Sequence, residues 1–249
     1  VFVKRWIVFV LIFSITFMQY AADYQLEEPP YAYKVRGDRY RRMGSEYYAL
    51  ALREYERAIQ QRRNYSECYY WTAWIFKEKG LYDQALMEID LAIQYKEALE
   101  YKSLFIDMLY LKSEIFFKSN KNSEGKKVLE EIVDYLTRFR EQITDLTEPI
   151  YRRKFGMAFF LIGTYYRHIN DLNVRKAKFF LQAIQLGFRP DMCHYFLHEF
   201  YKSKGNDNEA NSHLESVKRI LKQNGKTLEE LKSEISSLSW SKIWTIRQS

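Results

Sequence analysis

The feature that most constrains this chain is a helix-face pattern that returns after 34 residues. A small, a large and a small apolar residue stand at positions i, i+4 and i+7, which share one face of a helix. The pattern is found twice in succession, first at Ala51, Tyr55 and Ala58, and then at Ala85, Ile89 and Ala92. A period of this length predicts stacked two-helix units, each burying its apolar face only against its neighbours.

The same face returns further along the chain. After an insertion, it occurs at Gly125, Leu129 and Ile132. It then occurs at two places that are again 34 residues apart, first at Phe180 with Ala183 and then at Leu214 with Val217. The clearest unit runs from about 66 to 99, where Gly80 and Ala85 bound the turn into the second helix. Glycine suits that turn because it readily adopts the left-handed conformation that ends a helix.

With these positions the chain resembles the tetratricopeptide-repeat family. The resemblance covers five repeats, at about 32–65, 66–99, 106–139, 157–190 and 191–224. Repeat one departs from the family pattern, since Arg39 stands where a small residue is usual, and in repeat four Lys176 and Ala177 compete for another small position. The resemblance implies an all-α, right-handed superhelical solenoid whose first helices line a concave groove for peptides or other proteins.

Two segments outside the repeats are also expected to be helical. Residues 140–156 are expected to lengthen the helices on either side of them. After Gly225, the spacing of Thr227 and Glu230 predicts a capping box, and apolar residues then follow at helical spacing, at Leu228, Leu231, Ile235 and Leu238. Residues 225–249 are therefore expected to form a capping helix and a tail. The apolar residues within 240–246 either pack on this cap or bind a partner.

The first 22 residues predict a membrane-targeting segment. Lys4 and Arg5 precede an apolar run over residues 6–18, but the small residues that a cleavage site needs are poorly placed. Two interpretations stay open: a signal anchor that spans the inner membrane through residues 6–22, or a signal peptide that is removed. In both, the basic flank stays in the cytoplasm. The repeats, which follow a spacer at 23–31, are then expected in the periplasm.

Composition and motifs argue against an enzyme. Cys68 and Cys193 fall in repeats two and five, too far apart for a disulfide, so both are expected to be buried apolar side chains. His194 and His198 share a helix face with Glu199 next to them, but a third metal ligand is not evident and both histidines fall at packing positions. No catalytic group, metal or cofactor is therefore expected.

The resemblance also implies a set of groove-facing side chains, many of them aromatic. They are Arg36 and Tyr40 in repeat one, Tyr70, Trp74 and Lys77 in repeat two, Tyr110, Glu114 and Phe117 in repeat three, Leu161 and Tyr165 in repeat four, and Tyr195 and Glu199 in repeat five. The clamp of chaperone adaptors, which grips a carboxylate, needs Lys and Asn where Tyr70 and Trp74 stand, so that function is disfavoured. Aromatic side chains are the residues in which protein interfaces concentrate binding energy.

A basic stretch at 34–63 has nine Lys or Arg against four Asp or Glu, which indicates either a solvated face or a patch for an acidic partner or anionic lipid. Taken together, the sequence predicts a non-enzymatic scaffold of a bacterial envelope assembly. Similar proteins serve periplasmic flagellar collars, pilus biogenesis and outer-membrane assembly. Its expected partners are other proteins of a membrane-associated complex, with self-assembly possible and no nucleic acid. The alternative is a periplasmic module that binds a small ligand or lipid within the superhelix.

Overall fold

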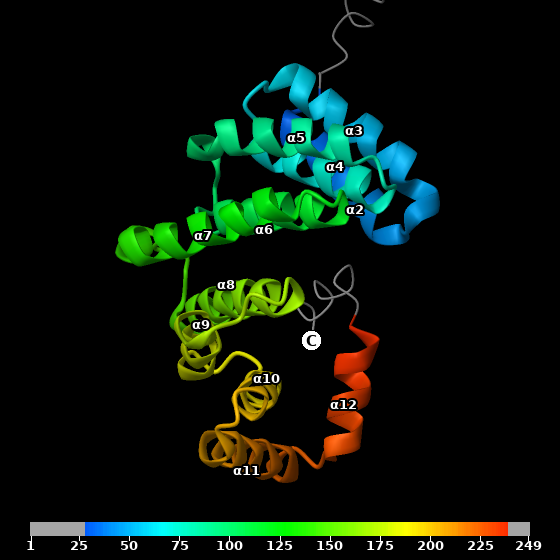
Figure 1. Ribbon diagram of the computed structural model, residues 1–249. Coiled ribbons are helices and arrows are strands. Elements are labelled where there is room, and N and C mark those ends of the chain that lie inside the picture. The colour runs from blue at the N-terminus through cyan, green and yellow to red at the C-terminus, as the bar shows by residue number, and fades with distance from the viewer. Residues whose placement is uncertain (1–27, 239–249) are drawn as a thin grey trace, which may run out of the picture. The chain divides into compact units, whose positions relative to one another are not determined.

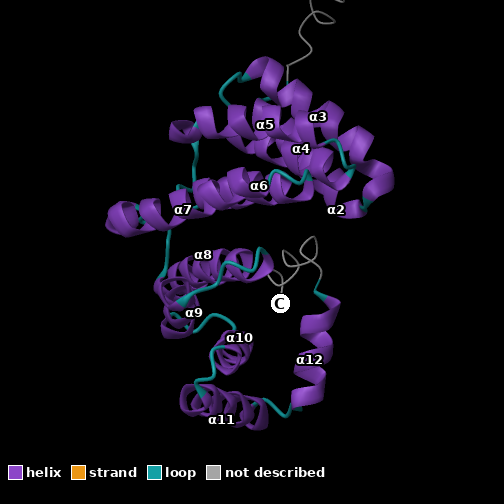
Figure 2. Ribbon diagram, in the orientation of Figure 1, coloured by secondary structure: helices purple, strands orange, loops and turns teal. Residues whose placement is uncertain are grey.

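The computed structural model describes residues 28–238, and within them all regular secondary structure is helical (Figures 1 and 2). The segment predicted to target the membrane, most of the spacer and the tail after residue 238 lie outside the described residues. Among the helices that are described, none is both long enough and apolar enough to cross a membrane. The chain divides into two compact units, Val1–Arg63 and Asn64–Ser249, which are taken in turn.

Among its described residues, 28–63, the first unit has one helix pair, α2 (Pro30–Met43) and α3 (Tyr48–Gln61), joined through a 3-10 turn at Ser45–Tyr47. Pro30 begins α2, where the missing N–H of proline removes no helical hydrogen bond. The helix-face residues of α3, namely Ala51, Tyr55 and Ala58, are completely buried, as the 34-residue pattern predicts.

The helix contact in this unit corrects the prediction for repeat one. The small residue of α2 is Gly37, where a Cβ would lie 2.6 Å from the ring of Tyr55, whereas Arg39 is exposed. The Tyr55 hydroxyl donates a 2.7 Å hydrogen bond to Asp38 Oδ1, and Lys34 Nζ lies 2.7 Å from Asp38 Oδ2. This polar bond holds the ring across position 37, so the close approach falls two residues before the place that the family pattern gives it.

The second unit contains four helix pairs and one further helix. The pairs are α4 (Ser66–Glu78) with α5 (Tyr82–Gln94), α6 (Leu104–Lys118) with α7 (Asn122–Phe139), α8 (Glu148–His168) with α9 (Val174–Gln185), and α10 (Pro190–Ser203) with α11 (Asp207–Gln223). They are followed by α12 (Leu228–Ser237). Each helix from α4 to α11 packs on the next one along the chain, so the pairs form a stack.

The first helix of each pair in this unit ends in the same way. The second residue after it is left-handed, with φ between 54° and 74°, at Gly80, Asn120, Asn170 and Gly205. In the first of these turns the Leu81 N–H donates to the Phe76 carbonyl at 2.9 Å, and the equivalent backbone hydrogen bond is present in the other three turns. Asparagine tolerates the left-handed region better than most residues. It therefore replaces the expected glycine in repeats three and four.

In two pairs, a side chain of the first helix is hydrogen-bonded to a backbone carbonyl of the second helix. Ser113 Oγ donates to the Gly125 carbonyl at 2.8 Å, and His198 Nδ1 lies 2.9 Å from the Ala210 carbonyl oxygen. In both pairs the two residues are twelve apart and the second-helix residue is small and buried. His198 is therefore a packing residue of repeat five, at the position that Ser113 holds in repeat three.

The register of repeat four, which the sequence left open, is settled by burial. Ala177 is 1% exposed and takes the small position on α9, whereas Lys176 makes an ion pair with Asp171 in the preceding turn. On α8, Gly163 faces the ring of Phe180. The turn in this repeat is therefore two residues longer than in the other pairs of the unit, because α9 begins four residues after Asn170, whereas α5 begins two residues after Gly80.

The insertion between repeats three and four lengthens one helix rather than the expected two. The 21-residue helix α8 begins at Glu148, well before the repeat that was predicted to start at 157. The preceding α7 ends at Phe139, and a short 3-10 helix, Arg140–Gln142, follows it. Ile143 is 3% exposed, so the chain turns toward the core after that 3-10 helix instead of continuing α7.

Cys68 and Cys193, in repeats two and five, are both completely buried, as predicted.

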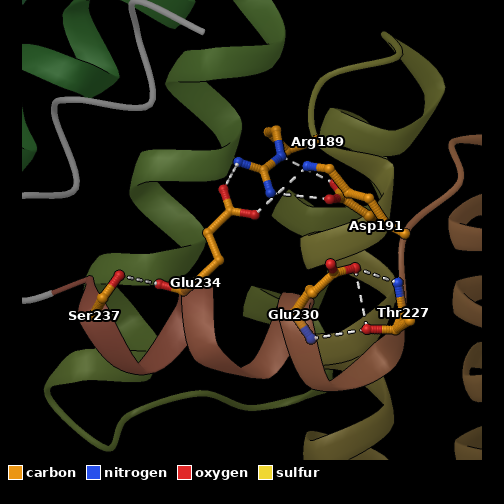
Figure 3. Close-up of polar contacts among 7 residues, drawn as sticks. Arg189, Asp191, Thr227, Glu230, Glu234 and Ser237 are labelled. Atoms are coloured by element: carbon orange, nitrogen blue, oxygen red, sulfur yellow. Dashed lines mark hydrogen bonds and ion pairs between the residues drawn. The ribbon is translucent and has the colours of Figure 1, made fainter.

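The last helix covers the end of the stack. Figure 3 shows the predicted capping box at its start, in which the Thr227 N–H donates to Glu230 Oε2 at 2.7 Å and the Glu230 N–H donates to Thr227 Oγ1 at 3.2 Å. Leu231 is 1% exposed, and Leu228, Ile235 and Leu238 pack against the core beside it. The apolar face of α12 thus contacts α10 and α11, as the helical spacing predicts.

An arginine ties α12 to the start of α10. Figure 3 shows the Arg189 guanidinium between two carboxylates, with Nη2 2.9 Å from Asp191 Oδ2 and Nη1 2.8 Å from Glu234 Oε1. Burial alone would raise the pKa of Asp191, but the hydrogen bonds and charge of Arg189 outweigh it and hold this pKa below its usual value. Asp191 is therefore ionised in the folded protein, and Arg189 is its counter-ion.

Candidate interaction surface on the first helices

The twelve predicted groove residues divide evenly by burial. Six are buried: Tyr70, Lys77, Tyr110, Glu114, Phe117 and Leu161. The other six are partly exposed: Arg36, Tyr40, Trp74, Tyr165, Tyr195 and Glu199. Arg36 and Tyr40 belong to the first unit, and the other ten belong to the second.

The buried six correct the prediction that they line an open groove. Tyr110 is 0% exposed, and its hydroxyl donates to the Lys154 carbonyl on α8. Tyr70 is 5% exposed and belongs to the core of the second unit. The family pattern identifies the face of a helix, but not how closely the next first helix approaches it. Here that approach is close enough to cover large side chains.

A buried ion pair joins the first helices of repeats two and three. Lys77 Nζ lies 3.2 Å from Glu114 Oε1, and the two residues are 7% and 8% exposed. The same ammonium lies 5.4 Å from the centre of the Trp74 ring and 2.5 Å from Glu78 Oε1. Removing one partner of such a pair leaves an uncompensated buried charge, which is strongly destabilising. Lys77 and Glu114 therefore hold these repeats together rather than contact a partner.

Ion pairs also join the later first helices. Lys154 Nζ on α8 lies 2.6 Å from Asp107 Oδ1 on α6, and Arg167 Nη2 on α8 lies 2.9 Å from Glu199 Oε2 on α10. With Lys77 and Glu114, one charged contact thus links each successive pair of first helices in the second unit. The sequence pattern did not identify Asp107, Lys154 or Arg167, because a charge pair between helices has no fixed spacing along the chain.

In the first unit, the two predicted groove residues are engaged within the unit itself. Arg36 Nε lies 2.9 Å from Glu54 Oε2, and its guanidinium also pairs with Glu28. The Tyr40 ring is stacked near Tyr47, with 6.4 Å between ring centres. Much of the charge that Arg36 brings to the basic stretch at 34–63 is therefore neutralised by carboxylates of the same unit.

A first-helix surface remains on the second unit. We define it by six partly exposed side chains, which are Trp71, Trp74, Tyr165, Arg167, Tyr195 and Glu199. Trp71 packs edge-on against Trp74, with ring centres 6.4 Å apart, and Tyr165 lies 6.2 Å from the ring of the buried Phe117. Rigid aromatic side chains of this kind, buried on one side and exposed on the other, suit a protein interface.

An open hollow on this surface lies between the C-terminal parts of α8 and α10, and we call it the α8–α10 hollow. Its volume is about 550 Å³, and its lining includes Arg167, His168, Phe196, Glu199, Phe200 and Lys204. The Arg167 guanidinium lies 4.5 Å from the centre of the Phe196 ring, and Lys204 Nζ lies 6.0 Å from that of Phe200. Two cations thus stand over an aromatic floor.

The two histidines that could have suggested a metal site take part in helix packing. His194 Nδ1 lies 2.9 Å from His213 Nδ1 on α11, and the His213 ring is stacked on Tyr201. Within the described part of the chain, no group of three or more His, Cys, Asp or Glu residues is arranged to hold a metal ion. Burial is the main reason that the pKa of His194 falls to about 4 and that of His213 also falls, so both rings are neutral at pH 7.

Comparison with known proteins identifies the fold. No protein-family model and no curated protein matches the sequence. Among solved structures, MamA of Desulfovibrio magneticus RS-1, from residue 41 to its end, is 18% identical over 78% of this chain and 96% of its own, with a TM-score of 0.56. Another MamA crystal structure is 13% identical over 77% of this chain and 97% of its own, with a TM-score of 0.54. The fold is a tetratricopeptide-repeat solenoid.

The thiol and the histidine pair of repeat five are packing groups. Burial raises the pKa of the Cys193 thiol well above its usual value, so the thiolate that a nucleophile needs is not formed near neutral pH. The His194–His213 pair is occupied with its own contact between α10 and α11. The first helices expose aromatic side chains next to charged side chains that are held in ion pairs.

Proposed function

We propose that this protein is a non-enzymatic scaffold that binds other proteins through the first-helix surface of its second unit. The observation that supports this most is the stack of tetratricopeptide pairs with Trp74, Tyr165 and Tyr195 partly exposed on the first helices of repeats two, four and five. Repeat solenoids use such extended surfaces to hold partners. Aromatic anchors that are half buried in the scaffold lose little conformational entropy when a partner covers them.

We further propose that the scaffold belongs to an assembly of the bacterial envelope. This part of the proposal rests on the sequence, in which Lys4 and Arg5 precede the apolar residues 6–18. A segment of this kind would hold residues 6–22 in the inner membrane and place the repeats in the periplasm. The partners would then be other proteins of a membrane-associated complex, as in a flagellar collar, a pilus machine or an outer-membrane assembly machine.

The alternative, a small ligand or lipid within the superhelix, has less support. Small-molecule sites are concave and bury most of the ligand surface. The α8–α10 hollow is open to solvent and bordered by charged side chains. An open hollow of this kind suits a peptide segment better than a lipid chain.

The proposal is tested by partner capture from intact membranes with the full chain. Wild-type protein is compared with Tyr195→Ala on α10 and with a matched change of an exposed apolar residue on a second helix, Met87→Ala on α5. We expect Tyr195→Ala to reduce the yield of specific partners while Met87→Ala leaves it unchanged, both variants melting as wild type does. Equal yields from all three proteins would contradict binding through the first helices.

Amino-terminal sequencing of the same membrane preparation tests the anchor, because a start near residue 23 would contradict it.

A further inference from the structure

We propose that the α8–α10 hollow binds an acidic peptide segment that carries an aromatic or large aliphatic side chain. The inference rests on the proposed scaffold function and names the chemistry of one partner segment. It is carried by the arrangement of charge over aromatic rings in the hollow. Arg167 and Lys204 bring two permanent positive charges to the hollow, which His168 also lines, against a single carboxylate at Glu199.

The guanidinium of Arg167 is preorganised to bind a carboxylate. It stacks over Phe196 at 4.5 Å while Nη2 bonds to Glu199 Oε2 at 2.9 Å, so both contacts fix its plane. Five N–H donors in a rigid fork are more than the carboxylate of Glu199 can accept. The donors that remain can bind a second carboxylate without further loss of side-chain freedom.

The position of the hollow explains why cations gather there. Arg167 and His168 stand in the last turn of α8, and Lys204 directly follows α10. The C-terminal end of a helix carries partial negative charge and therefore favours cations. An acidic segment entering the hollow meets these cations rather than the helix carbonyls.

The floor of the hollow supplies the second element of recognition. Phe196 and Phe200 are mostly buried, with 3% and 6% of their surface exposed, and they lie one helical turn apart on α10. What remains exposed of them lines the hollow together with Leu172 and offers apolar contact to one side chain of a partner. Charged groups around an apolar floor select an acidic partner and disfavour a basic one.

Replacing Glu199 tests whether the ligand carries negative or positive charge. If the ligand is acidic, Glu199→Gln removes the one opposing charge while its amide oxygen can still accept a hydrogen bond from Arg167, so binding should tighten by about threefold or more. If the ligand is basic, the same change should weaken binding. Glu199 and Arg167 side chains are each about 40% exposed, at 41% and 39%, so the change should cost the fold little.

The probe is the hexapeptide Glu-Phe-Glu-Glu-Phe-Glu-amide with fluorescein coupled to its amino terminus, titrated with the full chain and followed by anisotropy. Its matched control is the same peptide with lysine in place of each glutamate. We expect saturable, salt-sensitive binding of the acidic peptide in the micromolar range and weaker binding of the basic one. The double change Arg167→Gln with Lys204→Gln should weaken acidic-peptide binding by about tenfold or more. Lys178→Gln, an exposed lysine on α9 outside the hollow, should change it by less than about twofold.

Three results would overturn the inference. They are no saturation of the acidic peptide by about 1 mM protein, tighter binding of the basic peptide, or equal binding of the acidic peptide by wild type and the Arg167–Lys204 double variant. A failure of the inference is distinct from a failure of the proposed function. If the double variant still captures the same membrane partners as wild type, the scaffold stands and this hollow is not its binding site. If neither protein captures a specific partner, the scaffold function itself is wrong.

Discussion

The ring of Phe180 closes over Gly163, so that a Cβ at position 163 would lie 2.8 Å from it. Phe180 cannot move aside easily, because its ring is completely buried with its centre 6.4 Å from that of Phe160 and 5.4 Å from that of Phe196. This contact sets the distance between α8 and α9, the two helices of repeat four.

The change Gly163→Ala is therefore expected to destabilise the second unit, although alanine favours helix. The added methyl group overpacks the contact with Phe180, at a cost of about 1–3 kcal/mol. Urea denaturation followed by circular dichroism measures it, with the exposed Ser212→Ala on α11 as control. A midpoint equal to or above that of wild type would mean that α8 and α9 can separate at no cost, against the packing described.

The change Ala85→Arg tests the helix contact of repeat two. Ala85 is completely buried at the start of α5, so an arginine there must either force α4 and α5 apart or bury its charge. A loss of several kcal/mol is expected, on the order of 3 or more. Gln84→Arg, at the exposed neighbouring position, adds the same charge without burial. Equal melting temperatures for the two variants would show that the repeat register is wrong.

The second helices were the most predictable part of the fold. A small, large, small pattern at i, i+4 and i+7 leaves few arrangements, because only small residues permit two helices to approach closely. Ala85, Ile89 and Ala92 are accordingly all completely buried. The capping box of Thr227 and Glu230 was equally predictable, since both of its hydrogen bonds are local.

The candidate site was predicted less well, because it depends on distances between helices that no spacing along the chain encodes. Tyr110 and Leu161 occupy the expected first-helix face but are covered by their neighbours. Arg167 was not predicted at all, although it contacts both Phe196 and Glu199. Gly37 was missed because the polar bond between Tyr55 and its partner on α2 moves the contact by two residues.

The histidine pair between α10 and α11 predicts a pH dependence of stability. Burial, with the charges of His213 and Arg219, lowers the pKa of His194 to about 4, and burial and His198 lower that of His213 while Glu209 acts in the opposite sense. An unfolded histidine has a pKa near 6.5. As the pH falls, the unfolded state therefore takes up protons first and is favoured.

The stability that the neutral pair contributes is thus complete above about pH 6.5 and is lost between about pH 6.5 and 4. Because both rings are partly exposed to solvent, the loss should be about 1 kcal/mol. Thermal melts of wild type and of His194→Gln with His213→Gln, taken across this range, measure it. The wild-type melting temperature should fall more steeply than that of the double variant. Parallel curves would show that the pair does not titrate as described.

Arg189 is expected to hold α12 on the stack. Replacing it in Arg189→Gln removes the counter-ion of the mostly buried Asp191 and releases Glu234, at a cost of about 3 kcal/mol. Hydrogen exchange should then become faster over residues 228–237, with a smaller change in α4–α6. The control is Lys232→Gln, whose partner Glu229 lies on α12 itself. Unchanged protection of α12 in Arg189→Gln would show that its apolar face alone secures it.

Site-specific photo-cross-linking in cells tests the central claim most directly. Benzoylphenylalanine is placed in the full chain at Trp74 or Tyr195, on the first helices, and at Met87 or Leu181, which are exposed on second helices. The account predicts discrete cross-linked species, each containing a second protein, from positions 74 and 195 and none from 87 and 181. Cross-links only from positions 87 and 181, or none from any of the four, would contradict a scaffold that binds its partners through its first helices.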